Sequence, residues 1–274
     1  MNGQDRDVVK VVVAGALGAV GRKLVAALLS EKQELRLVGA YARRCVGEDV
    51  AAAIGVPSCG VRISRTIEEA LDSRPDVLID FTHPSVVRSH ISAAFERKIN
   101  VVIGTTGFFD RDFAAIDAAA RAAGVGAATG NFSLTAALLQ HFARFAAQHV
   151  PNWEIVEYAS HRKPDVPSGT ARELAELLHR KASPLPQFNP DDVIGPREAR
   201  GATFGGAQVH SIRLPSFANS LEIVFGLAGE RLTIRHDELD KEIFVKGALL
   251  AAERVMEITG LVRGLDSLLF GDGR

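Results

Sequence analysis

Hydrophobic runs alternate with helix-like patterns from the start of the chain. Val8–Ala14 is a nearly unbroken β-branched run, which is typical of a strand covered on both faces of a parallel sheet. Gly15–Gly21 interrupts the run, and the next segment places Leu24 and Leu28 on one face of a helix. Leu35–Tyr41 has the composition of a second strand. These elements form a βαβ unit, because parallel strands need such a crossover.

The same alternation continues to residue 130 and predicts a doubly wound parallel sheet. The predicted strands are Val77–Phe81, Val101–Ile103 and Val125–Ala128, and the predicted helices are Ile67–Leu71, Ser85–Arg97 and Asp112–Ala123. We therefore expect an α/β domain of the Rossmann type over residues 1–130.

The pattern changes after Asn131, where short strands and longer helices are interspersed. The predicted helices are Leu134–His149, Ala171–Lys181 and Phe244–Ile258, and the predicted strands are Trp153–Tyr158, Val209–Leu214, Leu221–Phe225 and Arg231–Arg235. Ala182–Pro196 contains four prolines and is predicted to be a surface loop. We expect a smaller α+β domain with a mixed sheet over residues 131–240, and residues 241–274 returning to complete the first domain.

Composition narrows the class of protein. The net charge is -1, which does not suit a nucleic-acid partner, and no apolar run approaches the roughly 18 residues of a membrane span. The two cysteines, Cys45 and Cys59, are too few for a disulfide framework. Met1–Lys10 is polar and charged, unlike a secretory signal. We expect a cytoplasmic protein.

Three glycines in the first turn suggest a nucleotide site. Gly15, Gly18 and Gly21 are spaced G-x-x-G-x-x-G and follow the first strand of the βαβ unit. Such glycines allow a tight turn, and they let a pyrophosphate approach free N–H groups at a helix N-terminus. We assign these glycines, with Ala19 and Val20, to the cofactor, although a glycine-rich turn that only connects strand to helix would look similar.

The end of the second predicted strand indicates which dinucleotide is bound. NAD-preferring sites usually carry an acidic residue here for the ribose 2′-hydroxyl, whereas this chain has Arg43 and Arg44. An arginine at this point can pair with a 2′-phosphate, so Arg43 predicts NADPH as the cofactor, with NADH as the alternative. The alternative is that Arg43 and Arg44 are solvated surface arginines with no role in cofactor binding.

A cationic loop before the helix predicted from Ala171 suggests an anionic substrate. Lys163 carries a positive charge and three donors, and Ser168, Gly169 and Thr170 would present N–H groups at a helix start. A carboxylate suits such a turn. An exposed basic loop before an ordinary helix is the alternative.

Several segments, in order along nearly the whole chain, resemble the dihydrodipicolinate reductase family of the bacterial lysine pathway. They are Gly15/Gly18/Gly21, Asp80-Phe81-Thr82-x-Pro84, Gly104-Thr105-Thr106-Gly107-Phe108, Asn131-Phe132-Ser133, Lys163-x-Asp165-x-Pro167-Ser168-Gly169-Thr170-Ala171, and Gly229-Glu230-Arg231-Leu232 followed by His236.

The resemblance implies a Rossmann domain plus an α+β domain, assembled as a homotetramer. It implies hydride transfer from NAD(P)H to a cyclic, imine-like dicarboxylate in lysine and diaminopimelate biosynthesis. Lys163 and the Ser168–Thr170 turn would bind this substrate, and Lys163 would assist proton transfer. The further residues that the resemblance assigns to the cofactor are Phe81, Thr82, Gly104, Thr105, Thr106, Asn131 and Phe132.

This chain departs from the family pattern at the proton donor. The family motif begins Glu-x-His-His, but Ala159 and Ser160 stand where the two histidines are expected. His161, two positions after the first of these, is the candidate replacement. The glycine-rich run that the family has after an arginine is replaced over Arg213–Ser220, and Lys241 stands where the family has an arginine before the last helix.

These departures leave three hypotheses open: a dihydrodipicolinate-reductase-like enzyme, a reductase of the same fold with another imine or keto acid as substrate, and a non-catalytic NADPH-binding protein. His83 follows a strand and is either a cofactor contact or a plain loop residue. No His/Cys/Asp cluster has metal-ligand spacing, so we expect no metal.

Overall fold

A computed structural model describes residues 8–30, 34–182, 184 and 192–271. Most of the predicted loop Ala182–Pro196 lies outside these residues. The chain divides into two compact units, of which the first comprises Met1–Leu134 with Lys241–Arg274 and the second Thr135–Asp240. Within the described residues, no helix is long and apolar enough to cross a membrane.

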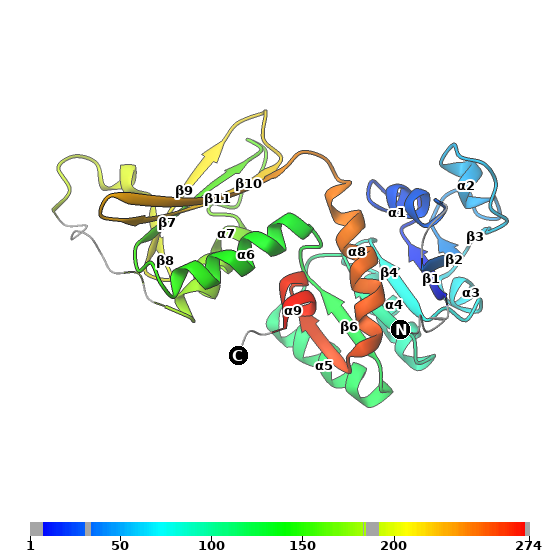
Figure 1. Cartoon of the computed structure of the whole chain (residues 1–274). Helices are drawn as coiled ribbons and strands as arrows, with labels where there is room; N and C mark the ends of the chain where they lie inside the picture. The colour runs from blue at the N-terminus through cyan, green and yellow to red at the C-terminus, as the bar shows by residue number, and fades with distance from the viewer. Residues whose placement is uncertain (1–7, 31–33, 183, 185–191, 272–274) are drawn as a thin grey trace, which may run out of the picture. The chain divides into compact units, whose positions relative to one another are not determined.

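The first unit contains a seven-stranded parallel sheet with the order β12-β6-β5-β4-β1-β2-β3 (Figure 1). The strands are β1 Val9–Ala14, β2 Leu35–Tyr41, β3 Ile63–Ser64, β4 Val77–Asp80, β5 Asn100–Ile103, β6 Gly126–Thr129 and β12 Gly260–Arg263. Every residue of β4 is buried, as the hydrophobic Val77–Ile79 predict for a central strand, and the strand ends on the buried carboxylate of Asp80. The chain places β2 and β3 on one side of β1 and β4 on the other, so strand order reverses between β1 and β4. Ligands of open α/β sheets bind in the crevice at this point.

Helices cover both faces of this sheet. They are α1 Gly21–Leu28, α2 Val50–Ala53, α3 Ile67–Leu71, α4 Val87–Glu96, α5 Asp110–Ala123, α8 Ile243–Arg254 and α9 Leu265–Phe270. Helices α3, α4 and α5 bury Leu71, Ile91 and Ile116 against one face, where they meet Leu78 and Val101 of the sheet. Helices α1 and α8 contact strands of the same sheet. The predicted Rossmann architecture is therefore confirmed.

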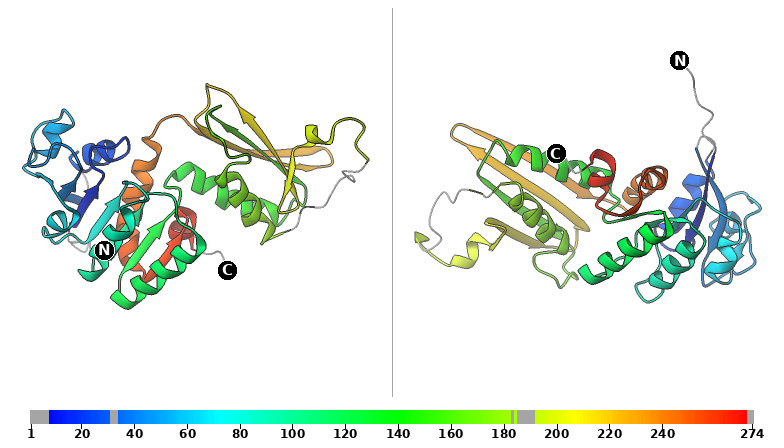
Figure 2. Two further views of the ribbon diagram at one scale, coloured as in Figure 1. Left: turned by 180° about the vertical axis from the view of Figure 1, so that it is seen from behind. Right: turned by 90° about the horizontal axis from the view of Figure 1, so that it is seen from below.

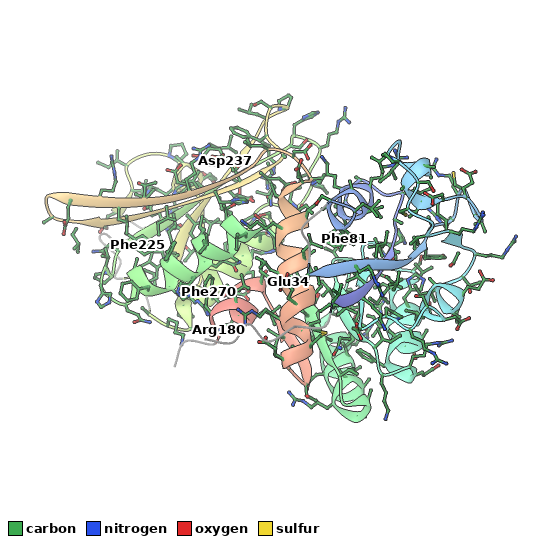
Figure 3. All side chains as sticks on the ribbon, turned by 45° about the vertical axis from the view of Figure 1, so that its right-hand side comes forward. Glu34, Phe81, Arg180, Phe225, Asp237 and Phe270 are labelled. Atoms are coloured by element: carbon green, nitrogen blue, oxygen red, sulfur yellow. The ribbon has the colours of Figure 1, made fainter. Side chains whose placement is uncertain are left out.

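The second unit is a mixed five-stranded sheet in the order β11-β10-β7-β9-β8, with two helices on one face (Figure 2). Its elements are α6 Leu134–Ala147, β7 Trp153–Ala159, α7 Gly169–His179, β8 Ala202–Phe204, β9 Ala207–Arg213, β10 Asn219–Leu227 and β11 Glu230–Glu238. Strand β7 alternates buried and half-buried residues, which places Trp153, Ile155, Glu157 and Ala159 on the helix-covered side. Phe225 of β10, labelled in Figure 3, joins the same core.

Among the described residues, five α-helices and β-strands were not predicted, nor was the 3-10 helix Arg197–Arg200. Strand β12 pairs with β6 and extends the sheet of the first unit. The other four are the short α2, β3, β8 and α9. The last long helix is α8, which ends at Arg254 before a 3-10 turn at Val255–Glu257, so it is shorter than the predicted Phe244–Ile258. Helix α7 begins at Gly169, two residues before the predicted start.

Candidate active site

Steric fit explains the glycines in the turn after β1. Gly15 has a φ of +83°, and a Cβ added there would lie 2.3 Å from the carbonyl oxygen of Phe81. A Cβ on Gly21 would lie 2.0 Å from the carbonyl oxygen of Gly15. The turn is therefore folded tightly on itself and against the end of β4, and this packing brings two of the predicted cofactor segments together.

The start of α1 is open to an anion. Its N-cap, Val20, provides no side-chain cap, and in the described chain the N–H groups of Ala19 and Val20 have no acceptor. Gly18 donates to the carbonyl of Gly15 at 2.8 Å, which completes the turn. Uncapped N–H groups at a helix N-terminus are the feature that binds a phosphate.

The carboxylate of Asp80, the last residue of β4, connects two of the loops assigned to the cofactor. It is fully buried, and its Oδ1 accepts hydrogen bonds from the Thr82 hydroxyl at 2.6 Å and from the Thr105 hydroxyl at 2.9 Å. Its Oδ2 lies 2.7 Å from Nδ1 of His90 on α4. The loops after β4 and β5 are thus fixed to one carboxylate.

Aromatic packing joins the loop after β6 to the same edge of the sheet. Phe81, labelled in Figure 3, lies so close to Gly104 that a Cβ there would be 2.3 Å from its ring. The rings of Phe81 and Phe132 are 6.2 Å apart between centroids. Asn131 accepts the N–H of Ser133 at 3.0 Å, and Thr106 is exposed in the loop after β5. The structure thus brings the assigned cofactor residues that follow β1, β4, β5 and β6 to one edge.

Two further side chains shape this edge. Arg88 of α4 donates to Asp112 at 2.9 Å and to the carbonyls of Pro84 and Gly107, so it ties the loops after β4 and β5 together. No motif in the sequence pointed to Arg88. His83 has its Nδ1 2.9 Å from the Ser85 hydroxyl and organises the turn before α4.

Arg43 and Arg44 follow β2 at the same edge and are exposed. Within the described residues, neither guanidinium has an ion pair. The loop beyond them is organised by Asp49, which accepts hydrogen bonds from the N–H groups of Ala51, Ala52 and Gly60. These and other donors lower the pKa of Asp49 to about 2.

The cationic turn of the second unit is built around Asp165. Its Oδ2 accepts the N–H of Gly169 at 3.3 Å and lies 3.4 Å from the ammonium of Lys163. Partial burial would raise the pKa of Asp165, but the Lys163 charge and the hydrogen bonds lower it overall. In the described chain, the N–H of Thr170 has no acceptor, so the turn carries two kinds of donor, the ammonium of Lys163 and the N–H of Thr170.

Ser168 has a structural place in this turn. It is fully buried, its hydroxyl caps α7 by accepting the N–H of Ala171 at 3.2 Å, and its own N–H is donated to Glu157. Gly169 is exposed and Thr170 half-buried, so these two residues form the accessible part of the Ser168–Thr170 turn.

Two of the three departures from the family pattern lie together at the end of β7, and the third, Lys241, belongs to the first unit. Ala159 is fully buried and its carbonyl accepts the N–H of Leu214 at 3.1 Å. The N–H of Ser160 donates to Ala218 at 3.4 Å, so the replaced segment Arg213–Ser220 borders the replaced histidine positions. His161 is exposed. Among the described residues, no group of His, Cys, Asp or Glu side chains could hold a metal ion.

A Rossmann sheet with an uncapped helix start beside its switch point, joined to a separate α+β unit with a cationic turn, is the arrangement of a two-domain oxidoreductase. The family models for the N-terminus and the C-terminus of dihydrodipicolinate reductase match residues 9–132 and 134–269. The chain belongs to the dihydrodipicolinate reductase family, which uses a nicotinamide cofactor.

Individual relatives agree with this assignment. The 4-hydroxy-tetrahydrodipicolinate reductase of Moorella thermoacetica is 40% identical over 95% of this chain and 98% of its own length. That of Halalkalibacterium halodurans is 37% identical over 95% of this chain and 99% of its own length. The dipicolinate-bound dihydrodipicolinate reductase of Paenisporosarcina sp. TG-14 has a TM-score of 0.83 and 30% identity, and the match covers 96% of this chain and 100% of that chain.

Proposed function

We propose that this chain reduces 4-hydroxy-tetrahydrodipicolinate with NADPH, in lysine and diaminopimelate biosynthesis. The Lys163–Thr170 turn carries this proposal, because it combines an ammonium with N–H groups at a helix start. Two carboxylates on a small ring need such donors. The relatives are named for this reaction, and the structural relative from Paenisporosarcina holds dipicolinate, itself a dicarboxylate.

The residues at the edge of the first sheet fit a dinucleotide. The open N–H groups of Ala19 and Val20 would bind the pyrophosphate beside Gly15, where a side chain would fill the space. Arg43 would pair with the 2′-phosphate, which favours NADPH over NADH. When bound, the nicotinamide supplies the hydride. Phe81, Thr82, Gly104, Thr105, Thr106, Asn131 and Phe132 would surround its ring.

The second unit would orient the substrate and deliver the proton. Lys163 and the N–H of Thr170 would bind a substrate carboxylate, while the N–H of Gly169 is donated to Asp165 and the Ser168 cap keeps the turn in shape. The ammonium of Lys163 is the proton donor that the geometry favours, because Asp165 orients it. His161 is the second candidate for this step.

A related substrate is the second candidate function. Ala159 is fully buried where the family has its presumed proton donor, and the segment after Arg213 borders it. A substrate pocket that differs from the family at Ala159 and in the segment after Arg213 would suit another cyclic imine or keto acid. This alternative keeps the fold, the cofactor and the carboxylate-binding turn.

We further propose a cytoplasmic homotetramer. Opposite its helices, the second sheet carries half-buried Val156 and Val224 with exposed Ile212, an apolar strip that a second copy could cover. Cys45 and Cys59 are free thiols, which suits a reducing compartment.

The first measurement is the initial rate of NADPH oxidation by the purified protein with freshly generated 4-hydroxy-tetrahydrodipicolinate, with NADH in parallel. We expect turnover near the enzyme median of about 10 s⁻¹. Tight NADPH binding with negligible turnover would reject this substrate, and activity on another imine or keto acid would then support the second candidate.

A further inference from the structure

Glu157 on β7 is a fully buried carboxylate next to the cationic turn. Its Oε1 accepts three hydrogen bonds, from the N–H of Ser168 at 2.9 Å, the hydroxyl of Ser211 at 2.7 Å and Nη2 of Arg213 at 2.6 Å. A buried carboxylate without donors would be very costly, so this convergence of donors is required for the fold.

Strand pairing explains how residues far apart in sequence meet here. Strands β7 and β9 are parallel, with Glu157 opposite Ser211 and Ala159 opposite Arg213. Residues two apart on a strand point to the same face, so Ser211 and Arg213 both lie on the side of Glu157 that α7 covers. The replaced segment Arg213–Ser220 therefore begins with a residue that contacts Glu157.

Arg213 connects Glu157 to the substrate turn. The same Nη2 that donates to Glu157 also donates to the carbonyl oxygen of Asp165 at 2.7 Å. Asp165 in turn accepts the N–H of Gly169 and pairs with Lys163. Contacts thus run from Glu157 through Arg213 and Asp165 to the ammonium assigned to the substrate.

Glu157 also fixes the other end of the turn. It accepts the N–H of Ser168, whose hydroxyl caps α7. Both ends of the segment between Asp165 and Ser168 are therefore fixed by Glu157, one directly and one through Arg213.

The pair has little freedom to rearrange. Within the described residues, Oε2 of Glu157 and Nε of Arg213 are buried without hydrogen-bond partners, so the contact between the two side chains is made by Oε1 and Nη2. Nη1 of Arg213 donates to the carbonyl of Ile212. Burial would raise the pKa of Glu157, but its serine and arginine donors lower it, which keeps the carboxylate ionised beside the guanidinium.

We propose that Glu157 and Arg213 are the positioning pair of the substrate turn, which hold Asp165 and Ser168 so that Lys163 and the N–H of Thr170 present a preformed site to a carboxylate. This inference rests on the proposed function for the identity of the ligand. Neither residue touches the substrate. Their contribution is to remove the cost of ordering the turn when a ligand binds.

The test compares Glu157→Gln and Arg213→Lys with the wild-type protein. Glu157→Gln keeps the shape but removes the charge, and Arg213→Lys keeps the charge but removes the planar guanidinium. Glu222→Gln is the matched control, because Glu222 also pairs with an arginine, Arg235 at 3.1 Å, but on the opposite face of the sheet.

Three quantities are measured: the Kd of dipicolinate, the Kd of NADPH, and amide hydrogen exchange over residues 163–171 without ligand. We expect dipicolinate to bind about 10-fold to 100-fold more weakly to Glu157→Gln, as the loss of one hydrogen bond to a charged group predicts. Exchange should rise over residues 163–171, and NADPH binding should not change. Arg213→Lys should give the smaller effect, and Glu222→Gln none.

The exchange data separate this inference from the proposed function. If the wild-type protein does not bind dipicolinate, the proposed substrate class fails, and exchange over residues 163–171 still decides the role of the pair. Unchanged exchange in a folded Glu157→Gln variant would overturn the inference. If Glu157→Gln does not fold, Arg213→Lys must show the faster exchange, and the inference is wrong if it does not.

Discussion

The Nδ1 atom of His90 lies 2.7 Å from Oδ2 of Asp80, and both side chains are buried. Because the carboxylate can only accept, His90 carries its proton on Nδ1. This contact from α4 orients a carboxylate whose other oxygen takes the hydroxyls of Thr82 and Thr105. One histidine outside the cofactor motifs therefore stabilises two loops that we assign to the nicotinamide.

Asp80→Asn should weaken both stability and cofactor binding. The amide cannot accept all these hydrogen bonds, so we expect unfolding free energy to fall by about 1–3 kcal/mol and the Kd of NADPH to rise about tenfold. Titration calorimetry measures the affinity. Asp117→Asn is the control, since Asp117 also accepts hydrogen bonds in the first unit, from Arg121 and Leu261, but on α5. Equal affinity in both variants would contradict the prediction.

Gly15→Ala should abolish NADPH binding by steric displacement. The new Cβ would lie 2.3 Å from the Phe81 carbonyl, which must shift together with the turn. Gly47→Ala is a matched control, because Gly47 also has a φ of +83° but nothing within 4 Å of the added Cβ. Both variants carry the left-handed strain of roughly 1–2 kcal/mol. Only Gly15→Ala should lose the cofactor, and comparable affinities would refute the steric account.

Arg43→Ala should raise the KM for NADPH by about tenfold and leave the KM for NADH unchanged, because only NADPH carries the 2′-phosphate that a guanidinium binds. Steady-state kinetics with both cofactors measure the ratio. Arg36→Ala serves as the control, since Arg36 is an exposed arginine on β2, the strand that precedes Arg43. An equal rise in the KM for NADPH and for NADH would mean that Arg43 does not bind the 2′-phosphate.

Lys163→Met should lower kcat/KM by about 100-fold or more, because it removes both a carboxylate partner and the favoured proton donor. Arg162→Met removes the neighbouring exposed cation and should have little effect. His161→Gln should lose less than about tenfold, since no side chain in the described ranges orients the exposed imidazole. A loss as large as that of Lys163→Met would assign the proton transfer to His161.

Acid should destabilise the second unit through His236. Burial lowers the pKa of His236 below 6.5, although Glu238 and Asp237 oppose the shift. At pH values between the lowered pKa and 6.5, His236 is protonated in the unfolded chain but not in the folded one. The free energy of unfolding that is present above pH 6.5 is therefore lost as the pH falls through this range. Denaturation followed by Trp153, the single tryptophan and part of the core of this unit, measures the effect.

The variant His236→Gln should flatten this dependence on pH. His149→Gln, which changes an exposed histidine in the same unit, should retain the wild-type slope. Equal slopes for wild type and His236→Gln would show that another group titrates.

The long buried strands and the glycine turn were predictable because their signals are local. Three consecutive buried positions in β4, Val77–Ile79, are filled by hydrophobic residues, and a φ of +83° at Gly15 favours glycine. Strand β12 was missed because its four residues are stabilised by pairing with β6, more than 130 positions earlier in the chain. Its short sequence, Gly260–Arg263, has no strong strand pattern of its own.

The residues of the candidate site also fall into those that the sequence predicts and those that it does not. Lys163 and Gly169 were predicted from a contiguous motif. Glu157 and Arg213 are 56 positions apart and become partners only through the register of β7 and β9. Arg88 contacts Asp112 from another helix. Side chains that support a site from a distance can therefore be identified only from a structure, whereas candidates in the loops can be predicted from the sequence.

The return of residues 241–274 to the first unit sets an order of assembly during synthesis. The second unit is one continuous segment, Thr135–Asp240, so all of it leaves the ribosome before α8 and β12 do. Domains generally fold as units as they emerge. The inserted unit can therefore complete its fold first, while the nucleotide-binding unit that surrounds it in sequence must wait for the last residues of the chain.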